Sequence, residues 1–290
     1  MDVDLRKLRY FVAVAEESHF GRAAERLHIT QPVLSRQIRA LEGELGAQLF
    51  SRGKQSTELT GAGRQLLEDA RPLLASAQAL GRRVQRAARG ASVFTVGFMP
   101  GITVTRAVRE FTARHPELDL QVVRTSWDTQ VRAVHEGVLD VSFVRLPVDH
   151  RGLTLRPVFR EPRVAVLPAH HRLAGKQSLG IADLAAERLL QDPDAVPEWR
   201  DLPDRRVGGE DAGPVAAFRS VEEKLEHVAL SGGVLVLPLS TATYYTRTDV
   251  VHVAIDDIGP NEVCVAWSAD RNSPLLPEFA EIAAIAVTQG

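Results

Sequence analysis

Residues 29–50, ITQPVLSRQIRALEGELGAQLF, decide the fold of the first part of this chain. The apolar positions recur at intervals of three and four residues: Leu34, Ile38, Leu41 and Leu45. This spacing predicts a helix with one buried face. Thr30 is a good residue to cap its start, Pro32 falls in the first turn, where a missing N–H does no harm, and Gly46 ends the pattern.

The opposite flank of this predicted helix gathers hydrogen-bond donors near its start: Gln31, Ser35, Arg36 and Arg39, beside Pro32. One interpretation is a solvated face, although such faces usually mix charges of both signs and use more Glu and Lys. The other is DNA binding, because glutamine pairs with adenine, arginine with guanine and serine with phosphate or a base edge. The first turns of a recognition helix reach the floor of the major groove, and this favours DNA.

The segment LFSRGKQSTELT, residues 49–60, predicts two short extended pieces around Gly53. Such a hairpin, or wing, would place Arg52 and Lys54 against the DNA backbone or the minor groove. Shorter helical patterns over 5–17 and 21–27 precede the opening stretch. Residues 1–60 therefore predict a winged helix–turn–helix domain that binds double-stranded DNA.

Three segments carry a family resemblance: FVAVAEESHFGRAAERLHIT (11–30), QPVLSRQIRALEGELGAQLFSR (31–52) and LTGAG (59–63). From about Leu5 to Gly63 the chain resembles the winged helix–turn–helix of LysR-type transcriptional regulators. The resemblance implies that Gln31, Pro32, Ser35 and Arg36 contact an operator and that Arg52 lies on the wing.

A heptad seam follows Thr60, itself a plausible helix cap: Leu66, Ala70, Leu73, Ala77, Leu80 and Val84. We expect a linker over residues 61–90, with a helix from 61 to 89 that is about 43 Å long at about 1.5 Å per residue and bends near Pro72. One alternative is a helix that packs only on its own domain. The length favours pairing of two chains, whose recognition helices must meet half-sites about one DNA turn apart. The resemblance implies the same homodimer, and a tetramer as a dimer of dimers.

Charge is distributed unevenly along the 290 residues, whose formal net charge is −2. Residues 1–90 hold 15 Lys and Arg against 10 Asp and Glu, and the remaining 200 residues carry the acidic excess. A basic segment on an acidic body favours a polyanion-binding module joined to another domain.

The start of the chain lacks a secretory signal and no apolar run is long enough to span a membrane, so we expect a cytoplasmic protein. Cys264 is alone, in the apolar run VCVAW, and we expect a buried strand residue.

Strand and helix patterns alternate through residues 91–290. We expect strands at 93–98, 118–125 and 139–146, one helix that begins at Val104 and another over 128–137. This order predicts parallel strands with crossover helices. HPELDL (115–120), EGVLDV (136–141), LPAHHRLA (167–174) and SGGVLVLP (231–238) resemble the family's effector-binding module, which is similar to periplasmic binding proteins. The resemblance implies two α/β lobes, about 92–162 plus 267–290 and about 163–266. The predicted fold class is thus α/β with an all-α-type winged N-domain.

A ligand in such a sheet binds at the carboxyl ends of the strands. The residues expected there are Thr103 after the first strand, Thr125, Ser126, Trp127 and Thr129 after the second, and Arg145 at the end of the third. Hydroxyls with an arginine favour a small anion, such as an aromatic or other small carboxylic acid. In relatives that sense such acids, the pattern F-x-R-L supplies an effector contact, and residues 143–146 match it. A surface salt bridge is the alternative for Arg145.

No pattern in the sequence favours catalysis, a metal or a cofactor: G-x-S-x-G, H-E-x-x-H and P-loop patterns do not occur. His170 and His171 are adjacent on an extended segment, so their side chains should point to opposite faces. The predicted function is a transcriptional regulator whose operator binding responds to a small molecule. A small-molecule binding protein, or an enzyme whose N-domain is only regulatory, is the alternative.

Overall fold

The computed structural model describes residues 4–51, 57–88, 92–203, 218 and 220–288. The chain divides into two compact units. The first holds residues 1–89 with 135–137, and the second holds residues 90–134 with 138–290.

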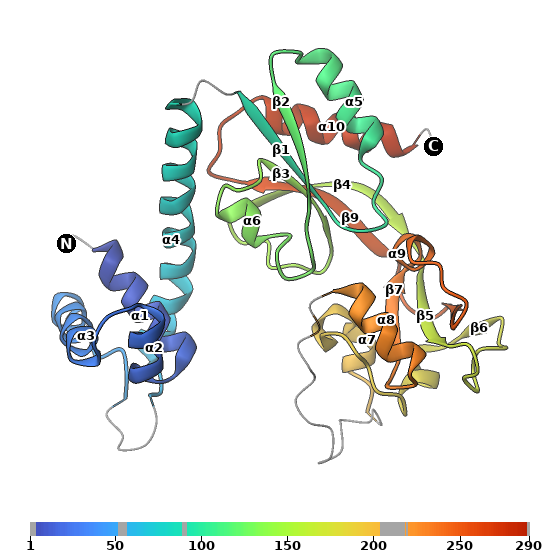
Figure 1. The fold of residues 1–290 in the computed structure, drawn as a ribbon, viewed down its shortest axis with the longest axis horizontal. Coiled ribbons are helices and arrows are strands. Elements are labelled where there is room, and N and C mark those ends of the chain that lie inside the picture. Colours follow the sequence, from blue (N-terminus) through green and yellow to red (C-terminus); the bar gives the residue numbers. More distant parts are fainter. Residues whose placement is uncertain (1–3, 52–56, 89–91, 204–217, 219, 289–290) are drawn as a thin grey trace. The chain divides into compact units, whose positions relative to one another are not determined.

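The first unit is built from helices: α1 (Leu5–Glu17), α2 (Phe20–Arg26), α3 (Gln31–Leu45) and α4 (Gly61–Ala88). In Figure 1, α1, α2 and α3 gather beside the start of α4. Their apolar faces close one core that contains Leu8, Phe11 and Val14 of α1 and Leu34, Ile38 and Leu41 of α3. Ala23 and Ala24 of α2 are buried in the same core, since their small side chains allow the helices to approach closely.

Helix α3 follows the sequence prediction at both ends. Pro32 stands in its first turn, and Gly46 ends it with φ +65°, a left-handed conformation that suits glycine. Thr30 occupies the cap position, but its side chain makes no capping hydrogen bond. Phe50 and Leu59 pair as an antiparallel bridge on either side of residues 52–56, as the predicted hairpin requires.

Helix α4 begins as predicted, because the Thr60 hydroxyl accepts a hydrogen bond from the Gly63 N–H at 3.0 Å. It continues through Pro72 to Ala88 as one helix. Its early seam residues pack on the first unit: Ala70 is buried and Leu66 is partly buried against the core. The later ones do not, since Leu73, Leu80 and Val84 are about half exposed or more in the single chain.

The second unit begins with a sheet in the order β2-β1-β3-β9-β4. Its strands are β1 (Val93–Phe98), β2 (Asp119–Arg124), β3 (Val141–Arg145), β4 (Leu153–Glu161) and β9 (Asn261–Ser268). Strands β2 and β3 both pair with β1 in parallel, as predicted, whereas β9 is antiparallel to β3 and β4. Helices α5 (Thr105–Arg114) and α10 (Leu275–Thr288) cover one face through Phe111 and Phe279 (Figure 1). This sheet with α5 and α10 is lobe one.

Lobe two holds a smaller sheet in the order β6-β8-β5-β7. Its strands are β5 (Arg163–Pro168), β6 (Ser178–Leu179), β7 (Leu235–Pro238) and β8 (Val250–Ile255). Short helices surround it: η1 (Ile181–Leu184), η2 (Pro193–Ala195), α7 (Pro197–Arg200), α8 (Val221–Ala229) and α9 (Leu239–Tyr244). The chain passes between the lobes twice, from β4 to β5 and from β8 to β9.

Two sequence predictions need correction. The expected return to lobe one at residue 267 is too late, because the whole of β9 from Asn261 pairs with β3 and β4. The helix expected over 128–137 shrinks to α6 (Arg132–His135). The preceding residues form turns instead, since the Thr129 hydroxyl accepts a hydrogen bond from the Ser126 N–H and the buried Gln130 side chain accepts one from the Arg145 N–H.

Candidate functional site

Helix α3 presents two different faces. Leu34, Ile38 and Leu41 are buried in the core of the first unit. The polar set from the sequence lies on the other side: Gln31, Pro32, Arg36 and Arg39 are exposed and Ser35 is half-buried. Within the described residues, none of these side chains has a hydrogen-bonding or ionic partner. Their donors are therefore available to a ligand outside the unit. Arg52 and Lys54 lie outside the described residues.

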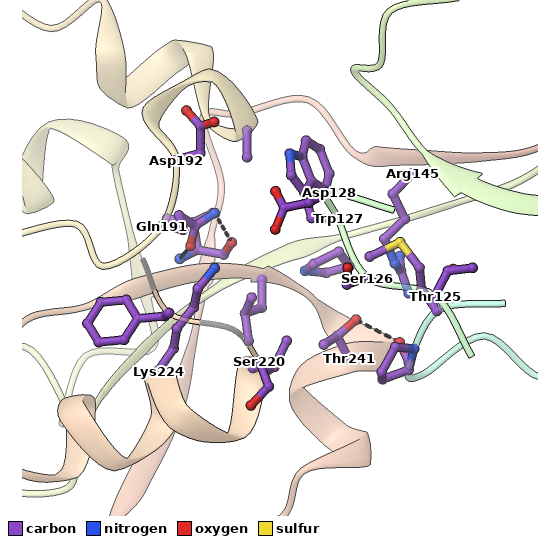
Figure 2. Close-up of a pocket in the computed structure, with 18 of the residues that line it drawn as sticks. Thr125, Ser126, Trp127, Asp128, Arg145, Gln191, Asp192, Ser220, Lys224 and Thr241 are labelled. Atoms are coloured by element: carbon purple, nitrogen blue, oxygen red, sulfur yellow. Dashed lines mark hydrogen bonds between the residues drawn. The ribbon is translucent and has the colours of Figure 1, made fainter. Parts of the chain in front are cut away.

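A cavity of about 580 Å³ lies between the two lobes of the second unit. Figure 2 shows its lining, which comes from the carboxyl ends of β2 and β3 in lobe one and from β7 and α8 in lobe two. Five of the residues expected at an effector site line this cavity: Thr125, Ser126, Trp127, Thr129 and Arg145. Thr103 does not line it, because it stands exposed in the connection between β1 and α5.

Arg145 is 2% exposed, so it does not form the surface salt bridge considered as its alternative role. Its Nη1 donates to Glu161 and, at 3.0 Å, to Asn261, and its Nη2 donates to Ser240 Oγ at 2.9 Å. Glu161 also accepts hydrogen bonds from the Ser240 N–H at 2.7 Å and hydroxyl at 3.0 Å. Burial lowers the pKa of Arg145, and the Glu161 carboxylate opposes that shift. The Arg145–Glu161 pair thus connects lobe one with α9 of lobe two, at the two points where the chain passes between the lobes.

The loop after β2 holds its hydroxyls in place. Ser126 Oγ and Thr129 Oγ1 lie 2.9 Å apart and share a hydrogen bond, and Ser126 N–H donates to Thr129 Oγ1 at 2.9 Å. Thr125 is 6% exposed, and within the described residues its hydroxyl has no hydrogen-bond partner. A buried, unpaired hydroxyl at a cavity wall can hydrogen-bond to a ligand or water.

Most of the charge around the cavity was not apparent from the sequence. Arg124 at the end of β2 donates to Glu222 and to the Tyr245 hydroxyl, both at 2.9 Å. Arg163 at the start of β5 pairs with Glu198. Lys224 on α8 also lines the cavity, and no ion pair involves it among the described residues. Asp128 and Asp192 are the acidic residues of the lining.

One sequence signal could have found Lys224. Helix α8 buries Leu225 and Val228, and Lys224 lies next to the first and one turn before the second. A lysine on the flank of a buried stripe often extends its charged end into a neighbouring space. The sequence does not show which space that is, because lobe two brings α8 to the strand ends of lobe one only in the folded chain.

The remaining candidates have structural roles. Cys264 is 1% exposed in β9, as expected, and burial raises the pKa of its thiol to about 11. His170 Nε2 lies 3.0 Å from Ser231 Oγ, whereas His171 Nδ1 accepts the Leu173 N–H at 3.3 Å. No cluster of three possible metal ligands occurs among the described residues.

Two family models match the chain. Residues 5–64 match the bacterial regulatory helix-turn-helix protein, lysR family, and residues 88–286 match the LysR substrate binding domain. The chain belongs to the LysR family. It is a DNA-binding transcriptional regulator of the LysR type with an effector-binding domain. Among the residues that the structure describes, no helix is long and apolar enough to cross a membrane.

Similar regulators extend over almost the whole chain. The regulator AlsR of Bacillus subtilis is 34% identical over 97% of this chain and 95% of its own length. The hca operon transcriptional activator HcaR of Escherichia coli is 30% identical over 97% of this chain and 97% of its own length. Among solved structures, the LysR family transcriptional regulator CbnR gives a TM-score of 0.58 at 26% identity, covering 98% of this chain and 99% of that one. Full-length BenM gives a TM-score of 0.54 at 25% sequence identity, and the match covers 99% of this chain and 97% of the BenM chain.

Proposed function

We propose that this LysR-type regulator reads a double-stranded DNA operator with the first turns of α3. The observation that carries this proposal is a polar set opposite the buried stripe of the same helix: Gln31, Pro32, Arg36 and Arg39, which are exposed, and Ser35, which is half-buried. None of these side chains has a partner among the described residues. Gln31 and Arg36 carry the side-chain groups that pair with base edges, and Ser35 can bond to phosphate. Arg52 and Lys54 would add contacts from the wing to the DNA backbone.

Two chains pair through α4 in this proposal. Leu73, Leu80 and Val84 form the exposed part of the heptad seam, and burying them against a second copy would remove apolar surface from water. A dimer of dimers would form the tetramer. A linker helix as long as α4 is needed when two paired chains must place their recognition helices on half-sites about one DNA turn apart. A solved relative, full-length CbnR, is described in complex with its target DNA.

The effector in this proposal is a small organic acid held in the cavity between the lobes. Thr125, Ser126, Trp127 and Thr129 supply its wall from lobe one, and Arg145 fixes the geometry of that wall from behind. Lys224 supplies a positive charge from lobe two. A ligand held by both lobes favours their closed arrangement, and closure would shift the spacing of the paired DNA-binding domains. The chain then acts by binding and not by catalysis, in the cytoplasm, where bacterial DNA lies.

A gel-shift experiment tests this proposal. The probe is the DNA upstream of the regulator's own gene, and the competitor is unrelated DNA of equal length. Small organic acids that raise the melting temperature of the protein are then added. The proposal requires a sequence-specific complex whose mobility or affinity changes with the acid. Equal binding to both DNAs would reject the operator, and indifference of the complex to every stabilising acid would reject the effector role.

A further inference from the structure

We propose that the effector is a zwitterion, an amino acid with an apolar side chain, whose carboxylate pairs with Lys224 and whose ammonium pairs with Asp128. This inference rests on the proposed function of the cavity and narrows its ligand class. It replaces a purely anionic ligand with one that carries both charges.

The charges of the cavity are largely neutralised within the protein. Arg124 pairs with Glu222, Arg145 with Glu161 and Arg163 with Glu198. Each of these guanidinium groups already has a carboxylate, so a bound anion would have to compete with a protein partner. The arginine-rich wall that the sequence favoured as an anion site is therefore close to neutral.

Lys224 is the lining cation that remains without a carboxylate within 4.0 Å among the described residues. Burial lowers the pKa of its ammonium, and the carboxylates of Asp128 and Asp192 act against that shift from a greater distance. A ligand carboxylate beside Lys224 would supply the missing counter-ion and favour the charged ammonium further. Lys224 thus fits the acid group of the ligand.

Asp128 supplies the opposite charge from the opposite lobe. It follows β2 in lobe one, and within the described residues its carboxylate has no hydrogen bond or ion pair. Asp192 differs, because it accepts a hydrogen bond from the Asp194 N–H at 2.9 Å as the cap of η2. In Figure 2 the side chains of Asp128 and Lys224 point into the same space from different elements. A purely anionic ligand beside Lys224 would be repelled by Asp128, whereas a ligand ammonium would be attracted to it.

The rest of the lining suits an apolar side chain. Trp127 of lobe one and Leu190, Phe218 and Val236 of lobe two line the cavity. Its volume of about 580 Å³ accommodates an amino acid as large as phenylalanine or tryptophan. The buried Thr125 hydroxyl, unpaired among the described residues, adds a hydrogen-bonding group at the lobe-one wall. A ligand that joins Asp128 to Lys224 would contact both lobes at once.

Ligands that differ by one charged group test the two proposed ion pairs separately. Isothermal titration calorimetry with the full chain would compare L-phenylalanine with 3-phenylpropionate, which lacks the ammonium, and with phenethylamine, which lacks the carboxylate. L-leucine and 4-methylpentanoate form a second pair, and thermal shift with the other apolar L-amino acids selects the best side chain. We expect L-phenylalanine or L-leucine, whichever binds more tightly, to bind at least about tenfold more tightly than its analogues that lack one charged group. Each analogue loses one ion pair in a half-buried site, and this loss reduces its affinity.

Three variants assign the contacts. Asp128→Asn should remove the advantage of the amino acid over its deaminated partner, and Lys224→Met should weaken both acids about tenfold while sparing the amine. Asp192→Asn tests the competing carboxylate, and we expect it to leave the discrimination in place. Loss of discrimination in Asp192→Asn but not in Asp128→Asn would overturn the assignment.

Two outcomes with the wild-type protein would overturn the zwitterion itself. The first is binding of the deaminated acids as tight as, or tighter than, that of every apolar amino acid. If those acids also change operator binding, the proposed function stands without this inference. The second is absence of binding by all apolar amino acids, which removes the ligand class directly.

Discussion

Arg145 and Glu161 form a buried ion pair that joins the end of β3 to the point where the chain enters lobe two. Asn261, at the return crossover, and Ser240, at the start of α9, also accept hydrogen bonds from the Arg145 guanidinium. The arginine that the sequence suggested as an effector contact thus holds the two lobes together behind the cavity. A ligand that favours lobe closure would act on this hinge.

Removing Arg145 should destabilise the second unit strongly. Arg145→Ala leaves Glu161 buried without its counter-ion, which typically costs about 3–5 kcal/mol of the free energy of unfolding. Chemical denaturation followed by the fluorescence of Trp127, Trp199 and Trp267, all in the second unit, measures this change. Arg160→Ala is a matched control, because its pair with Glu262 is exposed and is expected to contribute at most about 1 kcal/mol. An equal loss in the two variants would contradict the role of the buried pair.

The polar face of α3 should govern specificity. Gln31→Ala and Ser35→Ala are expected to weaken operator binding by about 1–3 kcal/mol each and to change binding to unrelated DNA much less. Competitive gel shifts at fixed salt concentration give both affinities. Glu44→Ala, on the same helix but paired with Lys7 of the same unit, is a control that removes an exposed side chain. Equal effects on both DNAs would show that these residues contact only the backbone.

The predicted wing contact should behave differently. Arg52→Ala is expected to weaken operator and unrelated DNA alike, because a phosphate contact carries no sequence information. The slope of log affinity against log salt concentration should decrease in magnitude by about 1. Fluorescence anisotropy over a range of salt concentrations measures that slope. An unchanged slope with lost specificity would instead place Arg52 on a base edge.

The exposed seam of α4 should hold the dimer together. Leu80→Glu places a charge on a side chain that is 57% exposed in the single chain, so the fold of one chain should tolerate it while pairing should not. Sedimentation velocity of the full-length protein is expected to show smaller species than the wild type. Gln78→Glu, an exposed position off the seam, serves as the control. A wild-type distribution for Leu80→Glu would exclude pairing through this part of α4.

The thiol of Cys264 should be unreactive in the folded chain. Burial raises its pKa to about 11, so almost no thiolate is present at pH 8. The neutral thiol is favoured in the folded state. Its contribution to stability is therefore complete below the ordinary thiol pKa of about 8.5 and decreases as the pH rises towards 11. Iodoacetamide labelling followed by mass spectrometry should be much slower in buffer at pH 8 than in denaturant. Equal rates would contradict the burial.

Local patterns predicted the first unit well, because periodicity and capping act over a few residues. The stripe Leu34, Ile38 and Leu41 and the terminal Gly46 appear in the structure as the sequence indicates. The helix expected over 128–137 is confirmed only over Arg132–His135, because the side chains of Thr129 and Gln130 stabilise turns through hydrogen bonds that a helical pattern does not show.

The cavity was only partly predictable. Strand order placed Thr125 to Thr129 at the carboxyl ends, and these residues do line the cavity. The neutralisation of Arg145 by Glu161, sixteen residues later, depends on how β4 crosses between the lobes. Lys224 depends on lobe two being positioned against lobe one. Charge at a site is a property of the whole fold, and for this reason the sequence alone favoured an anion.

A footprint of the DNA upstream of the regulator's gene tests the central claim most directly. The wild-type protein should protect half-sites about one helical turn apart, and Gln31→Ala and Ser35→Ala should lose this protection at concentrations where both proteins are folded. Adding the amino acid that most stabilises the protein should change the length of the protected region. Normal protection by both variants, or no protected region with the wild type, would contradict the account.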